Sequence, residues 1–483
     1  SHLWSYNLQY FDYALDLARA YRITGDPRYA RRFEHLAEGW IRGTTPGHGD
    51  GWEPYPISLR VVNWIYSLLL FGDAVDPSVR GRIEASLLQQ LGFLERRLEY
   101  HILANHLQKN LKALVIGGIV FSGRAAERWR KKGGRLLWRE LGEQVLPDGV
   151  HYERSPMYHA IALADFLEVI ALLTAAGEPV GEDVRNRVRQ MVEAFGVLSR
   201  PDGSLHLFND AANGIAPERS WIDLLARTVL GVGITHSDGL VALVGAGYFG
   251  FVDSASGLRL IVDCGEPGPE YQPGHAHCDL LSFELDVDGR PVIVDSGVSG
   301  YEGDPLREYV RSTRAHNTVM IGGREQSEIW GTFRVARRAR VLAAGQQGNL
   351  ANYCFQGAYS PYHDRRVAHH RLIERRGAAL TITDSVEGAY GAPLSSFVHV
   401  HPDFAVEREG ERYVLRHGGS VVVIHPFGVD RSTVEIGARQ PPQGWYCPEF
   451  GVAIPAPVLR LDVDRNDGRP FGYRIELVKS SNG

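Results

Sequence analysis

The 483-residue chain has few cysteines, no long apolar run and no large excess of either charge. Its cysteines form no CxxC pair, which excludes a zinc-finger pattern and a dense disulfide framework. No run of 18 apolar residues occurs, so the sequence predicts no membrane span. The net charge of −5 argues against a general nucleic-acid-binding protein, but it leaves room for a local basic cleft that binds a polyanion.

The length and the hydrophobic pattern predict two large domains. Residues 1–237 repeat apolar positions at helical spacing, and Gly, Pro, Asp and Asn stand at the joints. Asp26 and Pro27 of "TGDP" are typical of a helix start. A series of helical hairpins this long favours an α/α toroid over a single bundle. The expected helices cover residues 57–72, 78–98, 105–121, 124–141, 155–176 and 182–199.

Residues 238–483 change to a period of two, which is typical of β-strands. "LLSFELDVDGRPVIVDSG" predicts a hairpin that turns at Asp288 and Gly289. We therefore expect a large antiparallel β-sandwich domain after the helices. No low-complexity linker separates the halves, so the sequence predicts that they pack together and share a site.

Two helical segments carry unusual polar residues. "LANHLQKNLKAL" contains Asn105 and His106, and Asn105 is either a helix cap or a functional amide. In "ERSPMYHAIAL", Ser155 and Pro156 predict a helix start that places Tyr158 in the first turn. Such a tyrosine is either an ordinary buried aromatic or a proton carrier beside the helix N-terminus.

A second group of polar residues precedes strand-like segments in the β half. His275 and His277 of "GHAHCD" are expected on one face of a strand. His277, Asp295 and His316 are 18 and then 21 residues apart, which fits ligands from successive strands. Two histidines and an aspartate suit a zinc-type ion, although spacing alone would fit any three polar residues.

Seven ordered blocks of this sequence resemble the heparinase II/III-like polysaccharide lyases. They cover nearly the whole chain: "WEPYPISLRVVNW", "NHLQKNLKAL", "DGVHYERSPMYH", "FNDAANG", "GHAHCDLLSFEL", "PVIVDSGVSGY" and "RSTRAHNTVMIGGREQSEIWGTFR". The resemblance implies an α/α toroid followed by an antiparallel β-sandwich, with catalysis between them. It also implies β-elimination on uronate polysaccharides such as heparan sulfate, chondroitin, hyaluronan or alginate.

The resemblance assigns roles to individual residues. Asn105, with His106 beside it, matches the group that neutralises the uronate carboxylate, and Tyr158 and His275 match the proton carriers. Cys278, which follows His277, is a bystander or a soft extra ligand, and Tyr309 is left without a role. The resemblance implies one divalent ion, zinc before manganese or calcium, held by His277, Asp295 and His316. The residues expected to bind the polyanion are Arg60, Lys109, Arg154, Arg311 and Arg314.

A hydrolase and a non-catalytic binding protein are the alternatives to a lyase. A hydrolase on the same helical toroid would need a pair of carboxylates, and a non-catalytic polysaccharide-binding relative would need no proton carriers. The expected partner is an anionic uronate polysaccharide, with no nucleic acid and with the oligomeric state left open. A bacterial periplasmic or secreted location is favoured over the cytoplasm. The candidate carboxylates for a hydrolase are Glu53, Asp148, Glu153 and Asp210.

Overall fold

The computed structural model describes residues 2–478 and divides into two compact units. The helical unit consists of Ser1–Gln144 with Ala164–Asn186. The β-rich unit consists of Val145–Leu163 with Arg187–Gly483. Helices give way to strands between Leu230 and Gly239, whereas the compact units divide earlier in the chain.

Ten α-helices precede the first strand in the part of the chain that the structure describes. Six of them match the six helical runs whose bounds the sequence predicts, to within a few residues. Short 3₁₀ turns lie at Asp50–Trp52, Gly72–Ala74 and Thr313–Ala315. The helices are α1 His2–Tyr10, α2 Asp12–Thr24, α3 Pro27–Gly43, α4 Pro54–Phe71, α5 Pro77–Leu94, α6 Ala104–Val120, α7 Arg124–Gln144, α8 Pro156–Ala175, α9 Glu182–Leu198 and α10 Arg219–Leu230.

Local signals explain where several helices begin. The Asp26 side chain accepts a hydrogen bond from the Arg28 backbone N–H at 2.9 Å, and Pro27 occupies the first helical position of α3. This is the predicted cap. α8 is long and apolar enough to cross a membrane, but 72% of its most apolar window is buried in the protein. It is therefore built as a core helix.

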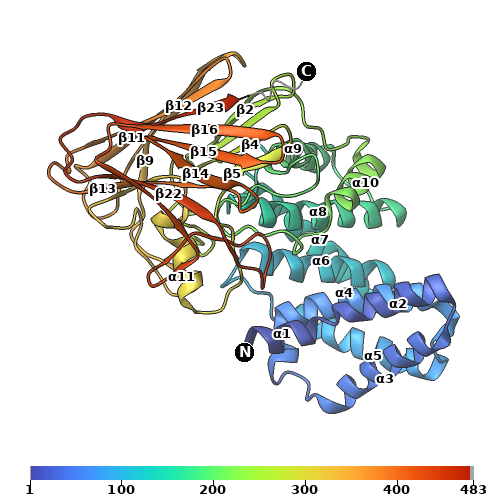
Figure 1. The fold of residues 1–483 in the computed structure, drawn as a ribbon. Helices are drawn as coiled ribbons and strands as arrows, with labels where there is room; N and C mark the ends of the chain where they lie inside the picture. Colours follow the sequence, from blue (N-terminus) through green and yellow to red (C-terminus); the bar gives the residue numbers. More distant parts are fainter. Residues whose placement is uncertain (1, 479–483) are drawn as a thin grey trace. The chain divides into compact units, whose positions relative to one another are not determined.

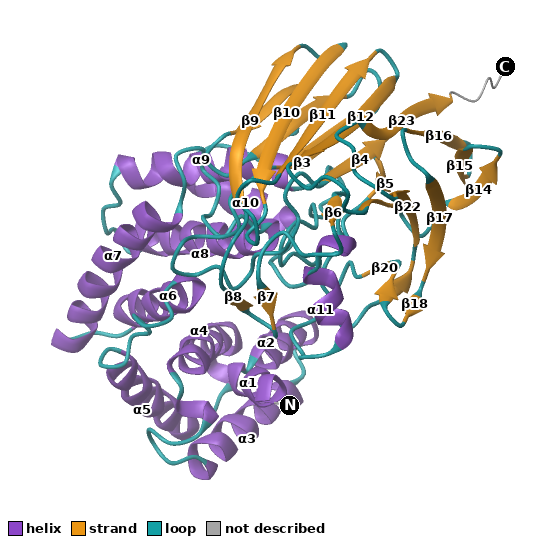
Figure 2. Cartoon of the chain, turned by 90° about the vertical axis from the view of Figure 1, so that its left-hand side faces the viewer, coloured by secondary structure: helices purple, strands orange, loops and turns teal. Residues whose placement is uncertain are grey.

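Three antiparallel sheets form the β-rich unit, as Figures 1 and 2 show. In spatial order, the five-stranded sheet contains β1 Gly239–Leu243, β2 Tyr248–Asp253, β3 Leu258–Asp263, β4 Phe283–Val287 and β5 Arg290–Ile293. The eight-stranded sheet contains β14 Ala405–Glu409, β15 Arg412–His417, β16 Ser420–Phe427, β23 Phe471–Val478, β12 Ala379–Glu387, β11 Ala368–Arg376, β10 Asn352–Ser360 and β9 Arg340–Gly348. The four-stranded sheet contains β17 Arg431–Ile436, β22 Pro457–Val463, β13 Leu394–His399 and β6 Val319–Ile321.

Small elements complete the unit. Figure 2 shows helix α11, Pro305–Arg311, beside a two-stranded hairpin of β7, Ile329–Trp330, and β8, Arg334–Val335. Two further strand pairs are β18 Ala438–Arg439 with β19 Pro442–Gln443, and β20 Trp445–Tyr446 with β21 Ile454–Pro455.

One apolar core joins the three sheets. Phe283 of β4, Ile382 of β12 and Leu459 of β22 belong to the same buried cluster, which confirms packed sheets. Asp288 and Gly289 join β4 to β5 with φ angles of 51° and 75°. Two consecutive positive φ angles are what a type I′ hairpin turn requires, so the predicted turn is confirmed.

Candidate active site

His275 is fixed by a carboxylate rather than by a strand. The loop of residues 264–282 precedes β4, so the prediction that His275 and His277 share a strand face is wrong. The two rings converge on Asp210 instead. Asp210 Oδ2 lies 2.8 Å from His275 Nδ1, and Asp210 Oδ1 lies 2.8 Å from His277 Nε2. Because a carboxylate accepts, each of these nitrogens carries a proton, and the opposite nitrogen of each ring keeps its lone pair.

Tyr158 packs on the ring of His275. Ser155 Oγ accepts from the Tyr158 backbone N–H at 3.3 Å, which caps α8 as predicted and leaves the tyrosine in the first turn. The rings of Tyr158 and His275 have centroids 4.0 Å apart at 33°. The His275 side chain is 15% exposed. Burial and then the neighbouring Tyr301 raise the pKa of Tyr158 well above its ordinary value, so the phenol keeps its proton at neutral pH.

Tyr301 is a site residue that the sequence reasoning missed. Its hydroxyl lies 3.0 Å from the Tyr158 hydroxyl, and its ring lies 5.0 Å from the Arg307 guanidinium. The only local signal was the glycine-rich loop "SGVSGYEGDP" after Asp295, which allows a tyrosine to reach inward. Tyr309 is buried elsewhere, where its hydroxyl accepts from the Gly444 backbone N–H at 3.2 Å.

Asp210 connects the two histidines to a cation. It is fully buried, and both of its oxygens accept from the Arg307 guanidinium. Burial alone would raise its pKa, but Arg307 and the hydrogen bonds from the two histidines outweigh burial and hold the pKa well below the ordinary value. Asp210 is therefore a permanently charged acceptor that fixes both rings.

His277, Asp279 and His316 form a fully buried group that could hold a metal ion. One ligand atom from each residue lies within 4.8 Å of the others. His277 Nδ1 and His316 Nε2 have no hydrogen-bond partner within residues 2–478, while the opposite nitrogen of each ring lies against a carboxylate. In the neutral form of each ring, the unpartnered nitrogen carries a lone pair. Two unpartnered imidazole nitrogens and a carboxylate suit a zinc-type ion, so these residues fit the predicted cation.

Asp295 takes a different place from the one predicted. Its Oδ2 lies 2.7 Å from His316 Nδ1, so it orients the ring, and Asp279 stands in the group where Asp295 was expected. Burial raises the pKa of Asp279 to about 6, with Asp295 adding to the shift. Burial also raises the pKa of Asp295. Neighbouring buried carboxylates repel one another, and a bound cation would relieve that repulsion.

Asn105 and His106 lie in the helical unit. Asn105 is the second residue of α6 and not its cap, since Leu103 holds the cap position. Leu103 and Ala104 have φ angles of 63° and 49°, a left-handed conformation that is costly for non-glycine residues and that clusters at functional sites. Asn105 is half-buried. His106 stacks on Tyr55 with ring centroids 4.2 Å apart, and its Nδ1 lies 3.2 Å from Glu99 Oε1.

Four of the five residues expected to bind substrate are engaged within the fold. Arg311 is 1% exposed and donates to the carbonyls of residues 276 and 331. Arg60 is fully buried and donates to the Gln90 side chain and to two carbonyls, so its prediction as a substrate contact is wrong. Its guanidinium also lies 3.9 Å from the Trp40 ring. Arg154 donates to the carbonyls of residues 245, 246 and 268, which makes it a clamp between loops. Lys109 forms an ion pair with Asp165 at 2.8 Å.

The carboxylates required for a hydrolase do not flank an open site in the β-rich unit. Asp210 is used by Arg307 and two histidines, and Asp148 accepts from the Ala246 backbone N–H at 2.8 Å. Glu153 Oε1 lies 3.9 Å from His275 Nε2, on the opposite side of the ring from Asp210. These carboxylates lie against histidines, an arginine and a backbone amide. They do not form the open pair that hydrolysis of a glycosidic bond requires.

Comparison with known proteins shows the family to which the chain belongs. Residues 1–220 match the heparinase II/III N-terminus, and residues 235–470 match the heparinase II/III-like C-terminal region. The chain belongs to the heparinase II/III family. A heparin-sulfate lyase of Pedobacter heparinus is 27% identical over 335 residues, which is 63% of this chain and 50% of that protein. A heparin-sulfate lyase of Bacteroides thetaiotaomicron is 24% identical over 350 residues, with the same coverage.

Solved structures show that the fold is the one expected for this family. A crystal structure of heparinase III covers 98% of this chain and 77% of its own, with a TM-score of 0.80 and 19% identity. A heparan sulfate lyase from Pedobacter heparinus covers 100% of this chain and 78% of its own, with a TM-score of 0.72 and 20% identity. The chain thus has an α/α toroid followed by an antiparallel β-sandwich, and it spans about half the length of the curated relatives that it matches.

Proposed function

We propose that this protein is a polysaccharide lyase that cleaves uronate-containing glycosaminoglycans by β-elimination. The observation that carries the proposal is the contact between the Tyr158 and His275 rings, with centroids 4.0 Å apart and with Asp210 behind His275. A protonated phenol and an imidazole with a free lone pair are an acid and a base side by side. Hydrolysis would need paired carboxylates at that point, and a binding protein would need neither proton carrier.

The proton transfers follow from the protonation states. His275 Nε2 removes the C5 proton of the uronate, and the electron pair of that bond forms the C4–C5 double bond. The C4–O bond then breaks, and Tyr158 gives its proton to the leaving oxygen. Tyr301, with its hydroxyl 3.0 Å from that of Tyr158, orients the phenol. Asp210 stabilises the imidazolium that forms on His275, since it accepts from Nδ1.

The uronate carboxylate must be neutralised, because the C5 proton is a poor acid and negative charge develops beside it. We assign this task to Asn105, with His106 supporting it. The strained turn at Leu103 and Ala104 supports the assignment, since it holds the start of α6 in an otherwise unfavourable conformation. The Asn105 side chain is half-buried rather than enclosed, so its amide is available to a ligand.

A divalent ion at His277, Asp279 and His316 would stabilise the wall behind the catalytic loop. We assign zinc, because two imidazoles and one carboxylate are its usual ligands, with manganese or calcium as alternatives. Asp210 and Asp295 would then orient the two ligating rings through their other nitrogens. This ion would contribute charge and rigidity, while the proton transfers belong to His275 and Tyr158.

The substrate class comes from the relatives. Since both are named heparin-sulfate lyases, we propose a sulfated uronate polymer of the heparan type as the first substrate to test, before chondroitin, hyaluronan or alginate. Both relatives are bacterial, which supports the expected bacterial source. A secreted or periplasmic location fits an extracellular polymer and stays a prediction.

The experiment is a panel of uronate polymers incubated with the purified protein. Elimination creates an unsaturated uronate end that absorbs ultraviolet light, whereas hydrolysis creates a reducing end without that absorbance. Growth of absorbance together with reducing ends supports the lyase. Reducing ends without absorbance would make the protein a hydrolase, and neither signal on any polymer would contradict catalysis on this class of substrate.

A further inference from the structure

Asn209 is a buried polar residue that the proposed proton transfers do not use. It is 4% exposed and precedes Asp210 in the loop between α9 and α10. Its φ angle is 56°, a left-handed conformation that asparagine tolerates better than most residues. Such a conformation persists only where the surroundings hold it, and positions of this kind cluster at functional sites.

The Asn209 amide joins two segments that are distant along the chain. Its Nδ2 donates to the Arg154 carbonyl at 3.3 Å, over 55 residues, and lies 3.4 Å from Asp263 Oδ2. Its Oδ1 accepts from the His277 backbone N–H at 3.2 Å, over 68 residues. Because a carbonyl only accepts and a backbone N–H only donates, these contacts fix which side of the amide faces each segment.

The first of these segments carries Tyr158. Arg154 also has a φ angle of 56°, and its carbonyl accepts from the Tyr248 hydroxyl as well as from Asn209. Its guanidinium donates to three loop carbonyls. The next residue, Ser155, caps α8 through the Tyr158 backbone N–H. The position of Arg154 therefore determines where α8 begins and where Tyr158 lies.

The second segment is the loop that carries His275. Asn209 contacts this loop twice, since its Oδ1 accepts from the His277 backbone N–H and its own backbone N–H donates to Asp279 Oδ2 at 3.1 Å. The neighbouring Asp210 backbone N–H donates to the His275 carbonyl at 3.1 Å. Residues 209 and 210 thus hold the backbone of the loop on both sides of His275.

Asp210 repeats the connection through its own backbone. Its carbonyl accepts from Ser155 Oγ at 2.6 Å, while its N–H donates to His275. Two consecutive residues therefore each bond to the start of α8 and to the histidine loop. Of the two, only Asn209 makes this connection with its side chain, so a substitution can remove the connection there and leave the carboxylate of Asp210 in place.

We propose that Asn209 is a positioning residue that sets the distance between Tyr158 and His275. The inference rests on the proposed function, in which these two side chains transfer the protons. Because Asn209 is buried, it acts through the two segments that its amide joins rather than through a contact with the substrate. A displacement of about 1 Å between reacting groups can lower a rate about 10²-fold, so the amide matters for kcat.

Two substitutions of Asn209 separate its contacts. Asn209→Gly removes the whole amide, while glycine adopts a φ angle of 56° without strain. Asn209→Asp keeps the shape of the side chain and the acceptor for the His277 N–H, but the ionised side chain has no donor for the Arg154 carbonyl. Each variant therefore retains the left-handed backbone and loses a different set of hydrogen bonds.

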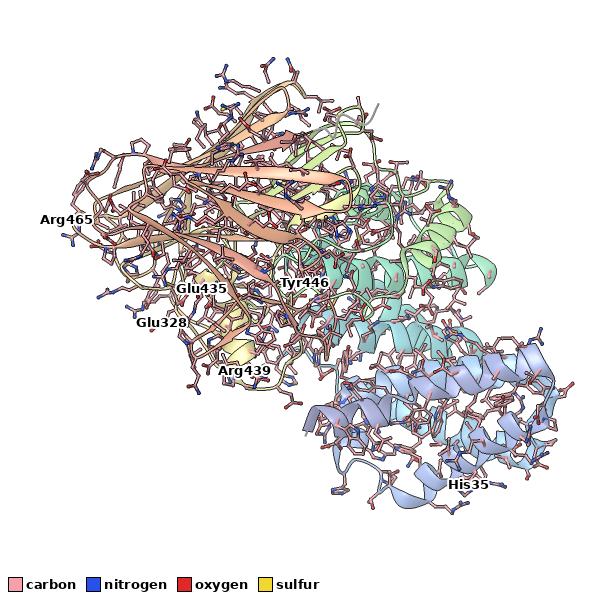
Figure 3. The ribbon with its side chains drawn as sticks, in the orientation of Figure 1. His35, Glu328, Glu435, Arg439, Tyr446 and Arg465 are labelled. Carbon is pink, nitrogen blue, oxygen red and sulfur yellow. The ribbon has the colours of Figure 1, made fainter. Side chains whose placement is uncertain are left out.

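Asn466→Gly is the matched control. Asn466 is 2% exposed, and its Nδ2 donates to the carbonyls of Val386 and Ala389 at 3.0 and 3.1 Å. It is thus a buried asparagine that joins loops, and it contacts neither Tyr158 nor the histidine loop through these bonds. Figure 3 labels the preceding residue, Arg465, at the outer edge of the β-rich unit.

We expect kcat of Asn209→Gly to fall about 10²-fold while KM stays within about twofold of the wild-type value. Amide hydrogen exchange, followed by mass spectrometry, gives a readout that does not depend on activity. Residues 151–163 and 268–283 should each exchange about fivefold faster, the factor that one lost hydrogen bond of ordinary strength predicts. Asn209→Asp should accelerate exchange in residues 151–163 and spare residues 268–283. Asn466→Gly should keep the wild-type kcat and the wild-type exchange of both segments.

A wild-type kcat in Asn209→Gly, or wild-type exchange in both segments, would overturn the proposal. An equal fall of kcat in Asn466→Gly would overturn it too, because a general loss of stability would then explain the effect. A raised KM with an unchanged kcat would make Asn209 a substrate contact instead. The proposed function fails separately: if the wild-type protein cleaves no polymer, faster exchange of both segments in Asn209→Gly would keep the positioning role of Asn209 and lose the lyase.

Discussion

Two clusters of histidine and aspartate lie side by side in the β-rich unit and share Asp210. In the open cluster, His275 is 15% exposed and its ring packs on Tyr158. In the closed cluster, the side chains of His277 and His316 are fully buried, with ring centroids 5.3 Å apart. Each of the three rings donates one N–H to a carboxylate, so they differ in what their lone pairs face.

The difference teaches how identical side chains acquire different chemistry. A lone pair on a partly exposed ring that packs on a phenol can take a proton from a substrate. Two lone pairs that face each other inside, beside a carboxylate, can hold a cation instead. Under the proposed function, exposure and hydrogen-bond partners distinguish the proposed proton carrier His275 from the proposed metal ligand His277, two residues further along the chain.

Tyr158→Phe should have the largest effect on the open cluster. Removing one hydroxyl removes the proton for the leaving oxygen, so kcat should fall by about 10²–10⁴ while the midpoint of thermal unfolding stays close to that of the wild type. Steady-state rates on a heparan-type polymer measure it, with Tyr390→Phe, an exposed tyrosine, as control. Near wild-type activity in Tyr158→Phe would remove this phenol from the chemistry.

Asn105→Ala tests whether catalysis by His275 and Tyr158 also needs the amide of Asn105. If Asn105 neutralises the uronate carboxylate, kcat should fall by about 10²–10³, the usual effect of losing one donor to developing charge. Asn352→Ala, in an exposed strand position, is the control. A normal kcat with a raised KM would reduce Asn105 to a ground-state binding contact.

Two substitutions distinguish the roles of Asp279 and Asp295 beside the closed cluster. Asp279→Asn should abolish stoichiometric metal binding, because it removes a direct ligand. Asp295→Asn should weaken metal affinity by only about 10–100-fold, the usual effect of losing a partner that orients a ligating histidine. Metal content by mass spectrometry after dialysis measures both. The reverse order would return Asp295 to the ligand role that the sequence predicted.

A smaller effect concerns the stereochemistry of the substrate. His275 and Tyr158 are adjacent, so both reach the same side of a bound sugar. That geometry suits glucuronate, in which the C5 proton and the leaving oxygen lie on one side, so glucuronate-rich chains should have a severalfold higher kcat/KM than iduronate-rich chains. A preference for iduronate would mean that base and acid approach from opposite sides.

Local features of this protein could be predicted from the sequence. The cap at Asp26, the turn at Asp288 and Gly289 and the helix start at Ser155 each depend on residues within four positions of one another. The family resemblance added Tyr158 and His275, which no local pattern would have connected. Buried Arg60 was also recognisable in part, because it stands among apolar residues in "PISLRVVNW".

Long-range contacts could not be predicted in the same way. Asp210 meets His275 over 65 residues and Arg307 over 97, and Tyr301 meets Tyr158 over 143. Nothing in "FNDAANG" tells which aspartate oxygen will face which ring. The position of Asp279, rather than Asp295, in the buried group with His277 and His316 has the same origin, since such groups depend on how loops meet and not on spacing along the chain.

A direct comparison of His275→Ala with His277→Ala tests the division between the two clusters. Activity, metal content and the midpoint of thermal unfolding are measured for both variants in parallel. We expect His275→Ala to lose activity by about 10²–10⁴ while it keeps the metal and the wild-type midpoint. His277→Ala should lose the metal and unfold at a lower temperature. Loss of metal in His275→Ala, or full metal content in His277→Ala, would contradict the account.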